Sequence, residues 1–201
     1  MQRPSPTTLE SDRVRLEPIG PEHAAGLFEI GQDERTFDYM ISGPFLTLPA
    51  AEDEIAQMLA DQAAGVRVPF AVIDRVGDGA GHGKRERFAG TTSWLDIRPE
   101  HGGIEIGSTW YGVPFRRSHV NSDTKRLLLA HAFETLGAHR VQLLTDERNE
   151  ASRAAILRLG AAFEGILRRH KVYPNGFIRN SAIYAIVADE WPEIRERLDS
   201  R

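Results

Sequence analysis

The sequence IEIGSTWYGVPFRRSHVN occupies residues 104–121 and decides the fold that we predict. Its first half alternates between large apolar residues and polar or small ones, as a strand with one buried face does. This alternation directs Glu105 away from the face that holds Ile104 and Ile106. Apolar residues then recur at helical spacing over residues 122–136. The stretch therefore predicts a strand, a short turn rich in arginine, and a helix.

The turn between this strand and this helix supplies groups that favour an anion. We expect Asn121 or Ser122 to cap the helix and Gly137 to end it. Free backbone N–H groups and the positive end of the helix dipole both favour phosphate at a helix start, and Arg116 and Arg117 add positive charge. A solvated basic loop with an ordinary cap is the alternative interpretation, because helix starts are common and anion sites are few.

Strand and helix patterns continue on both sides of this stretch. The predicted order is β-α-α-β-β-β-α-β-α-β-β-α, without an internal repeat or a linker. The strands are expected at residues 13–19, 70–73, 88–97, 104–110, 141–145, 163–172 and 178–187, and the helices at 21–32, 50–64, 122–136, 149–159 and after Asp189. A glycine-rich hairpin loop is expected at residues 76–87. We therefore expect one α/β domain over residues 1–201 with a mixed sheet.

The composition narrows the classes of function. With 201 residues, 41% hydrophobic and 27% charged, the chain is typical of one globular domain. We expect a cytoplasmic protein without a membrane partner, because no run approaches the ~20 apolar residues of a membrane span and the first residues are rich in proline and charge. A net charge of −4 gives no reason to bind nucleic acid.

Other catalytic classes lose support as well. The chain has no cysteine, which excludes thiolate metal ligands and a cysteine nucleophile. Its 7 histidines form no His-Glu-x-x-His spacing, and there is no Gly-x-Ser-x-Gly elbow, so we expect neither a metal site nor serine hydrolysis.

Several spaced segments, in the right order, resemble the GNAT acetyltransferases, and within them the branch that includes the ribosomal-protein N-terminal acetyltransferases. The resemblance covers about residues 13–198 and is carried by EIGSTW at 105–110, RRSHVN at 116–121, KRLLLAHAF at 125–133, TDERNEASRAAI at 145–156, LGA at 159–161 and EGILR at 164–168. It implies the GNAT fold, a central mixed, mostly antiparallel sheet flanked by helices, with strands splayed apart near Trp110 and Val141. It also implies acetyl-CoA as cosubstrate and an amine as acceptor.

The resemblance places the pyrophosphate of acetyl-CoA on the turn that begins at Arg116. The cofactor-binding residues that it implies are Trp110, Tyr111, Arg116, Arg117, Ser118, His119, Val120, Asn121, Asn149 and Ser152. For the two aromatic residues, packing in the core or at a sheet edge is the alternative. His119 and Asn121 stand where the family has small residues, so a non-catalytic acyl-CoA-binding module is an alternative function.

Two residues are candidates for proton transfer. An amine is mostly protonated at neutral pH, so direct attack on a thioester needs a group that removes a proton. Glu105 is our candidate, since the family often has a glutamate on this strand, and a salt-bridging strand residue is the alternative. The resemblance implies that Ser152 protonates the departing thiolate and that Asn149 lies near the pantetheine arm. Capping of the helix is the alternative for both residues.

The acceptor stays open at this stage. The resembling branch suggests a protein N-terminal α-amine, and a small-molecule amine or antibiotic is the alternative, because fold and cofactor do not fix the substrate. A basic run at residues 168–171 lies near the expected acceptor end, where a solvated strand edge is the simpler interpretation. Family habit further suggests a homodimer.

Overall fold

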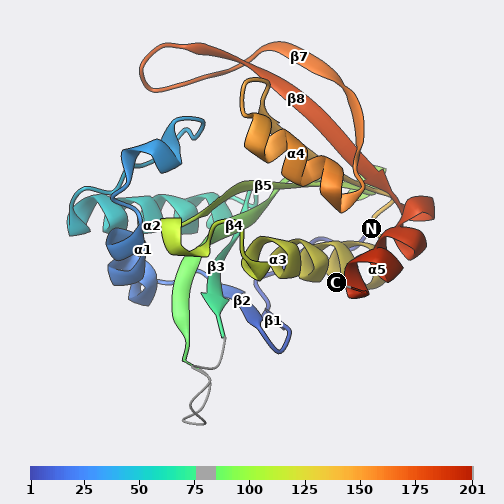
Figure 1. Ribbon diagram of the computed structural model, residues 1–201, viewed down its shortest axis with the longest axis horizontal. Helices are drawn as coiled ribbons and strands as arrows, with labels where there is room; N and C mark the ends of the chain where they lie inside the picture. The colour runs from blue at the N-terminus through green and yellow to red at the C-terminus, as the bar shows by residue number, and fades with distance from the viewer. Residues whose placement is uncertain (76–84, 201) are drawn as a thin grey trace.

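A computed structural model describes residues 1–75 and 85–200. Its strands form a sheet with the order β1-β2-β3-β4-β5-β6-β8-β7 (Figure 1). They are β1 (Leu9–Glu10), β2 (Val14–Pro18), β3 (Val68–Asp74), β4 (Arg87–Arg98), β5 (Gly103–Tyr111), β6 (Arg140–Asp146), β7 (Ala162–Val172) and β8 (Ile178–Val187). β5 and β6 pair in parallel, and the other neighbours in the described sheet pair antiparallel. The predicted mixed, mostly antiparallel sheet is confirmed.

Helices cover both faces of this sheet. They are α1 (Ala24–Ile30), α2 (Leu48–Ala63), α3 (His119–Ala130), α4 (Glu150–Leu159) and α5 (Trp191–Asp199). On β3, Phe70 and Val72 join the core beneath α3 and α5, whereas Ala71 and Ile73 join the core beneath α1 and α2. Figure 1 shows these two pairs of helices on opposite sides of the sheet. Every residue of β3 is buried, as expected for a strand covered on both faces.

The start of α3 corrects one sequence prediction. The helix begins at His119 and Ser118 is its N-cap, with Ser118 Oγ accepting a hydrogen bond of 3.3 Å from the Val120 N–H. Neither Asn121 nor Ser122 caps it, because the helix starts a turn before the apolar stripe from which we placed its boundary. The last turn of the predicted helix is a π-helical turn (His131–Thr135), and Gly137 follows with a φ of +68°.

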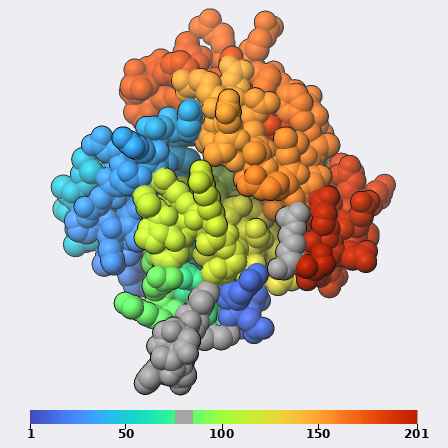
Figure 2. All heavy atoms as spheres, in the orientation of Figure 1, coloured from blue at the N-terminus to red at the C-terminus, as the bar shows by residue number. Residues whose placement is uncertain are grey.

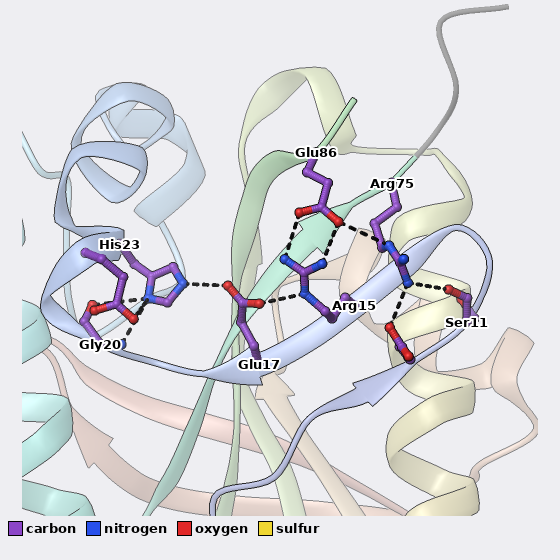
Figure 3. A network of polar contacts seen from close by, with 9 residues as sticks. Ser11, Arg15, Glu17, Gly20, His23, Arg75 and Glu86 are labelled. Atoms are coloured by element: carbon purple, nitrogen blue, oxygen red, sulfur yellow. Dashed lines mark hydrogen bonds and ion pairs between the residues drawn. The ribbon is translucent and has the colours of Figure 1, made fainter. Parts of the chain in front are cut away.

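A polar network ties the outer strands together (Figure 3). Arg15 on β2 donates hydrogen bonds to Glu17 and to Glu86, which precedes β4. Arg75, which follows β3, lies 3.3 Å from the same Glu86, and a ring nitrogen of His23 lies 2.9 Å from Glu17. The network contains no predicted site residue, so we read it as structural.

Two further observations bear on the sequence predictions. The two-residue strand β1 is an addition to the predicted order of elements. Most of the predicted hairpin loop at residues 76–87 lies outside the described residues, which omit 76–84. No helix in the described part of the chain is long and apolar enough to cross a membrane.

Candidate functional site

The site begins where two central strands separate. β5 and β6 are in register only at Gly103 with Arg140, Ile104 with Val141, and Glu105 with Gln142. Beyond this point β5 stays paired with β4, and β6 stays paired with β8. The pairing of β4 with β5 shifts register here, and Ser108 adopts a φ of +46°, as at a β-bulge. The predicted splay of these strands is confirmed, and it leaves backbone groups of both free to face a ligand.

A cavity of about 730 Å³ occupies the splay. This volume falls in the usual range for sites of small molecules and cofactors. Its walls come from β5, β6, the turn before α3 with the first turns of that helix, α4, residues 35–42, and single residues of β4, β7 and β8. Figure 2 shows a hollow in the surface between the blue segment that contains residues 35–42 and the orange helix α4.

The structure brings most of the predicted site residues to this cavity. Those that line it are Glu105, Trp110, Tyr111, Arg116, Arg117, Ser118, Asn121, Asn149 and Ser152. His119 and Val120 do not: a ring nitrogen of His119 lies 3.1 Å from Asp74 Oδ1, and Val120 is fully buried in the core. A contact of His119 with a bound phosphate is therefore left to its backbone N–H group, whereas the Val120 N–H already donates to Ser118 Oγ.

The turn before α3 forms the basic end of the cavity. Arg117 adopts a φ of +56°, which turns the chain sharply into the helix. Arg116 donates to the Tyr111 carbonyl oxygen at 3.3 Å and to Asp33 at 3.3 Å, and it also contacts Thr36. Arg116 thereby connects the end of β5 to the 3₁₀ helix Glu34–Phe37. The free N–H groups of the first helical turn lie at the same end.

Glu105 is a buried carboxyl at the narrow end of the splay. It is 7% exposed, and Gln142 Nε2 lies 3.4 Å from its Oε2. Burial raises the pKa of Glu105, while the charge of Lys171 and the hydrogen bond from Gln142 oppose that shift. Gly107 leaves room for this carboxyl, because a Cβ there would come within 2.6 Å of Glu105 Oε1. A buried carboxyl with a raised pKa, open to a cavity, is suited to accept a proton.

Lys125 is a cavity residue to which the sequence assigned no role. It is 6% exposed, and its Nζ donates a hydrogen bond of 2.8 Å to Thr109 Oγ1. Burial lowers the pKa of Lys125 to about 7, and the charge of Glu105 opposes that shift. The one signal in the sequence was its place in the resembling segment at 125–133, which does not reveal that the side chain is buried beside β5.

The start of α4 forms the wall opposite β5. Asn149 is the N-cap of this helix, with its Oδ1 accepting a hydrogen bond of 3.0 Å from the Ser152 N–H. The capping interpretation of Asn149 is therefore correct, and the same residue also lines the cavity. Ser152 is partly buried and lines the cavity from the first turn of the helix.

Comparisons with known proteins agree with this geometry. The family model described as an acetyltransferase (GNAT) domain matches residues 13–162. A GCN5-related N-acetyltransferase from Brucella melitensis is 29% identical, with a TM-score of 0.87 over 98% of this chain and 86% of that one. The uncharacterised N-acetyltransferase YoaA of Bacillus subtilis is 26% identical over 89% of this chain and 96% of its own. RimJ of Mycobacterium smegmatis, solved in complex with CoA-disulfide, shares the fold with a TM-score of 0.79 at 21% identity, over 100% of this chain and 97% of that one.

Proposed function

Because this chain belongs to the GNAT acetyltransferase family and is an acetyl-CoA-dependent N-acetyltransferase, we propose that its acceptor is the α-amine at the N-terminus of a protein. One observation carries transfer from acetyl-CoA to an amine: the buried carboxyl of Glu105 lies at the narrow end of a cavity whose other end carries the basic turn and start of α3. A base and a phosphate site thus share one cavity. The likeness of 87 residues of the chain, 33% identical, to the putative ribosomal N-acetyltransferase YdaF of Bacillus subtilis supports a protein acceptor.

The residues present fit acetyl-CoA as the substrate that donates the acetyl group. Arg116, Arg117 and the N–H groups of the first turn of α3 would hold its pyrophosphate. Backbone groups of β5 and β6, left free by the splay, would pair with the pantetheine arm. Trp110 packs against Phe37 and Phe45, with ring centroids 5.0 and 5.9 Å apart, so its main contribution is to the shape of the wall.

The reaction needs two proton transfers. The amine nitrogen forms a bond to the acetyl carbonyl carbon, and the bond from that carbon to sulfur breaks. Glu105 takes the proton that the amine loses, directly or through water, and the Ser152 hydroxyl gives a proton to the departing thiolate and regains one from solvent. Much of the rate would come from holding amine and thioester together in the cavity. The chain has no cysteine that could form an acyl-enzyme.

Two rival functions remain as outcomes of the test. One is acetylation of a small-molecule amine or an antibiotic in the same cavity. The other is a non-catalytic acyl-CoA-binding module, for which His119 was part of the reason. The His119 side chain does not support such a module, because it lies against Asp74 and not in the cavity.

The experiment is thiol release from acetyl-CoA in the presence of matched acceptors. Each peptide with a free N-terminus is compared with the same peptide blocked at its N-terminus, and with free amines and aminoglycosides. Release with the free peptides alone supports the proposal. Thiol release only with the free amines would mean that the acceptor is a small molecule and not a protein. Binding of acetyl-CoA without thiol release in the presence of any acceptor would contradict catalysis.

We further propose that residues 1–201 form one domain of a cytoplasmic homodimer. The sheet that runs from β1 to β7 supports one domain. Exposed apolar residues on the edge strand β7, Phe163, Ile166 and Leu167, support pairing of two copies at this edge. Light scattering after size exclusion tests the dimer, and cell fractionation tests the location.

A further inference from the structure

Two cations on the β7–β8 hairpin line the cavity. Lys171 on β7 and Arg179 on β8 lie opposite each other in the register of these strands. Arg179 is 6% exposed, and its Nε has no hydrogen-bond partner among the described residues. A buried donor without a partner costs free energy, about 1–3 kcal/mol for one group. A ligand that accepts this hydrogen bond would remove the cost.

These cations act on the reactive end of the site. Their charges lower the pKa of Glu105 against the effect of burial, and the effect of Lys171 is the larger. The hairpin also faces the segment at residues 35–42, because the Arg148 guanidinium lies 4.1 Å from the Phe177 ring centroid and 5.6 Å from that of Tyr39. Figure 1 shows the hairpin projecting beyond the rest of the sheet. The two cations therefore stand beside the proposed base, on a wall that an acceptor would meet.

The charges of the cavity are unbalanced. Glu105 is the acidic residue of its described lining, and the residues that stay positively charged there at neutral pH are Arg35, Arg116, Arg117, Arg158, Lys171 and Arg179. The phosphates of acetyl-CoA account for the arginines at the start of α3. They do not account for the hairpin pair, which belongs to other strands and acts on Glu105.

We propose that Lys171 and Arg179 bind an anionic group carried by the acceptor, a carboxylate or a phosphate close to its reactive amine. The inference rests on the proposed function and names its substrate class. In a peptide the anion is an acidic side chain just after the N-terminal residue, and in a small molecule it is the acid group of the amine itself. Charge-assisted hydrogen bonds to a guanidinium are strong and directional, so the pair would both bind and orient the acceptor.

The test compares acceptors that differ only in this charge. Peptides with Asp or Glu at their second and third positions are matched with peptides carrying Asn or Gln there, and a free amino acid is matched with its amide. The wild type should acetylate the acidic member of a pair with a kcat/KM at least about tenfold higher, the effect of one charged hydrogen bond. Activity confined to the peptide pair identifies a peptide acceptor, and activity confined to the amino acid pair identifies a small molecule.

Variants separate the two cations from general charge effects. Lys171→Gln and Arg179→Gln should each reduce the acidic-to-amide ratio about tenfold, whereas acetyl-CoA affinity stays within twofold. Loss of Lys171 also raises the pKa of Glu105, which changes the rate with every acceptor alike. The ratio between acidic and amide acceptors cancels this common effect. Arg168→Gln, the same loss of charge on the same strand but outside the cavity lining, should leave the ratio unchanged. If Arg179→Gln does not fold, the partly exposed Lys171 still carries the test.

Two results would overturn the inference. Equal kcat/KM for the members of every pair would do so, as would an equal loss of the ratio in Arg168→Gln. Binding of the same peptides to the CoA-bound protein, measured by calorimetry, needs no turnover. Tighter binding of acidic peptides without acetylation would support the anion site and contradict the proposed function. Acetylation of peptides without a preference for acidic ones would support the proposed function and contradict the anion site.

Discussion

Glu105 and Gln142 form the last pair of residues at which β5 and β6 remain in register. Gln142 is itself held in place, because its Nε2 donates to Asp96 Oδ2 at 2.8 Å and its Oε1 accepts from Arg98 at 3.1 Å. The carboxyl of Glu105 is therefore fixed at the point where the strands begin to separate. The end of the pairing between β5 and β6 therefore both opens the sheet and places the proposed base.

Replacement of Glu105 tests its role as the base. Glu105→Gln keeps the shape and removes the proton acceptor, so kcat should fall about 10²- to 10⁴-fold. Burial raises the pKa of Glu105 above its usual 4.5, so the wild-type kcat/KM should fall as the pH drops through that raised value. The variant should lack this acid limb. An unchanged acid limb in Glu105→Gln, with acetyl-CoA affinity retained, would assign the base to another group.

Replacement of Ser152 tests the proton donor. Ser152→Ala should lower kcat at least about tenfold and affect acetyl-CoA affinity little, because the hydroxyl is needed when the thiolate departs. The cap of α4 survives this change, since Asn149 accepts from the backbone N–H of residue 152. Ser122→Ala removes another hydroxyl from the cavity lining and should leave kcat near the wild-type value. Equal kcat in both variants and the wild type would remove Ser152 from the mechanism.

A methyl group at Gly107 should act through Glu105. In Gly107→Ala the new Cβ would lie 2.6 Å from Glu105 Oε1 and 2.8 Å from Leu95 Cδ1, so the carboxyl must move. We expect kcat to fall about tenfold or more with little change in acetyl-CoA affinity. A double-mutant cycle with Glu105→Gln measures the coupling. Independent effects that simply add would show that Gly107 does not act by placing the carboxyl.

Lys125 should make stability depend on pH. The folded protein releases this proton near pH 7, whereas the unfolded chain keeps it until about pH 10.5. The unfolded state binds more protons between these values, so the contribution of Lys125 to stability rises with pH across that window and is least favourable below pH 7. Lys125→Met removes this dependence.

The measurement is the melting temperature of both proteins at pH 6 and pH 10. The Tm of Lys125→Met relative to the wild type should be higher at pH 6 than at pH 10, by about 3 °C or more. A difference in Tm that is the same at both pH values would show that Lys125 titrates normally.

The sequence predicted those parts of the site that depend on neighbours along the chain. Alternation over residues 104–106 directed Glu105 away from the face of Ile104 and Ile106, and those two side chains do lie in the core beneath α3. The same alternation placed Trp110 on that face, which is wrong, because the bulge at Ser108 turns Trp110 into the core beneath α1 and α2. The position of Asn149 before a helical stripe predicted the cap of α4, which the structure confirms. Local patterns suffice here because strand and helix periodicity fix which side chains share a face.

Contacts between distant segments could not be predicted in this way. His119 turns from the cavity because Asp74, at the far end of β3, lies beside it. Lys125 is buried only because Thr109 and the wall of the cavity lie over it. Arg179 reaches the cavity through the strand order β6-β8-β7, and no spacing in the sequence reveals that order.

Acetyl-CoA binding measured by calorimetry tests the central claim most directly, with the wild type compared with Arg117→Ala and with the Arg116→Ala, Arg117→Ala double variant. The account predicts a wild-type Kd in the micromolar range, about −8 kcal/mol, and at least tenfold weaker binding by the double variant. The single variant separates a phosphate contact from the structural contacts that Arg116 makes with Asp33 and Thr36. The Arg168→Ala, Arg169→Ala variant, an adjacent pair on β7, should bind as the wild type does. Equal acetyl-CoA affinity in the wild type and in the Arg116→Ala, Arg117→Ala variant would contradict a phosphate site at the start of α3. The absence of binding by the wild type would contradict it as well.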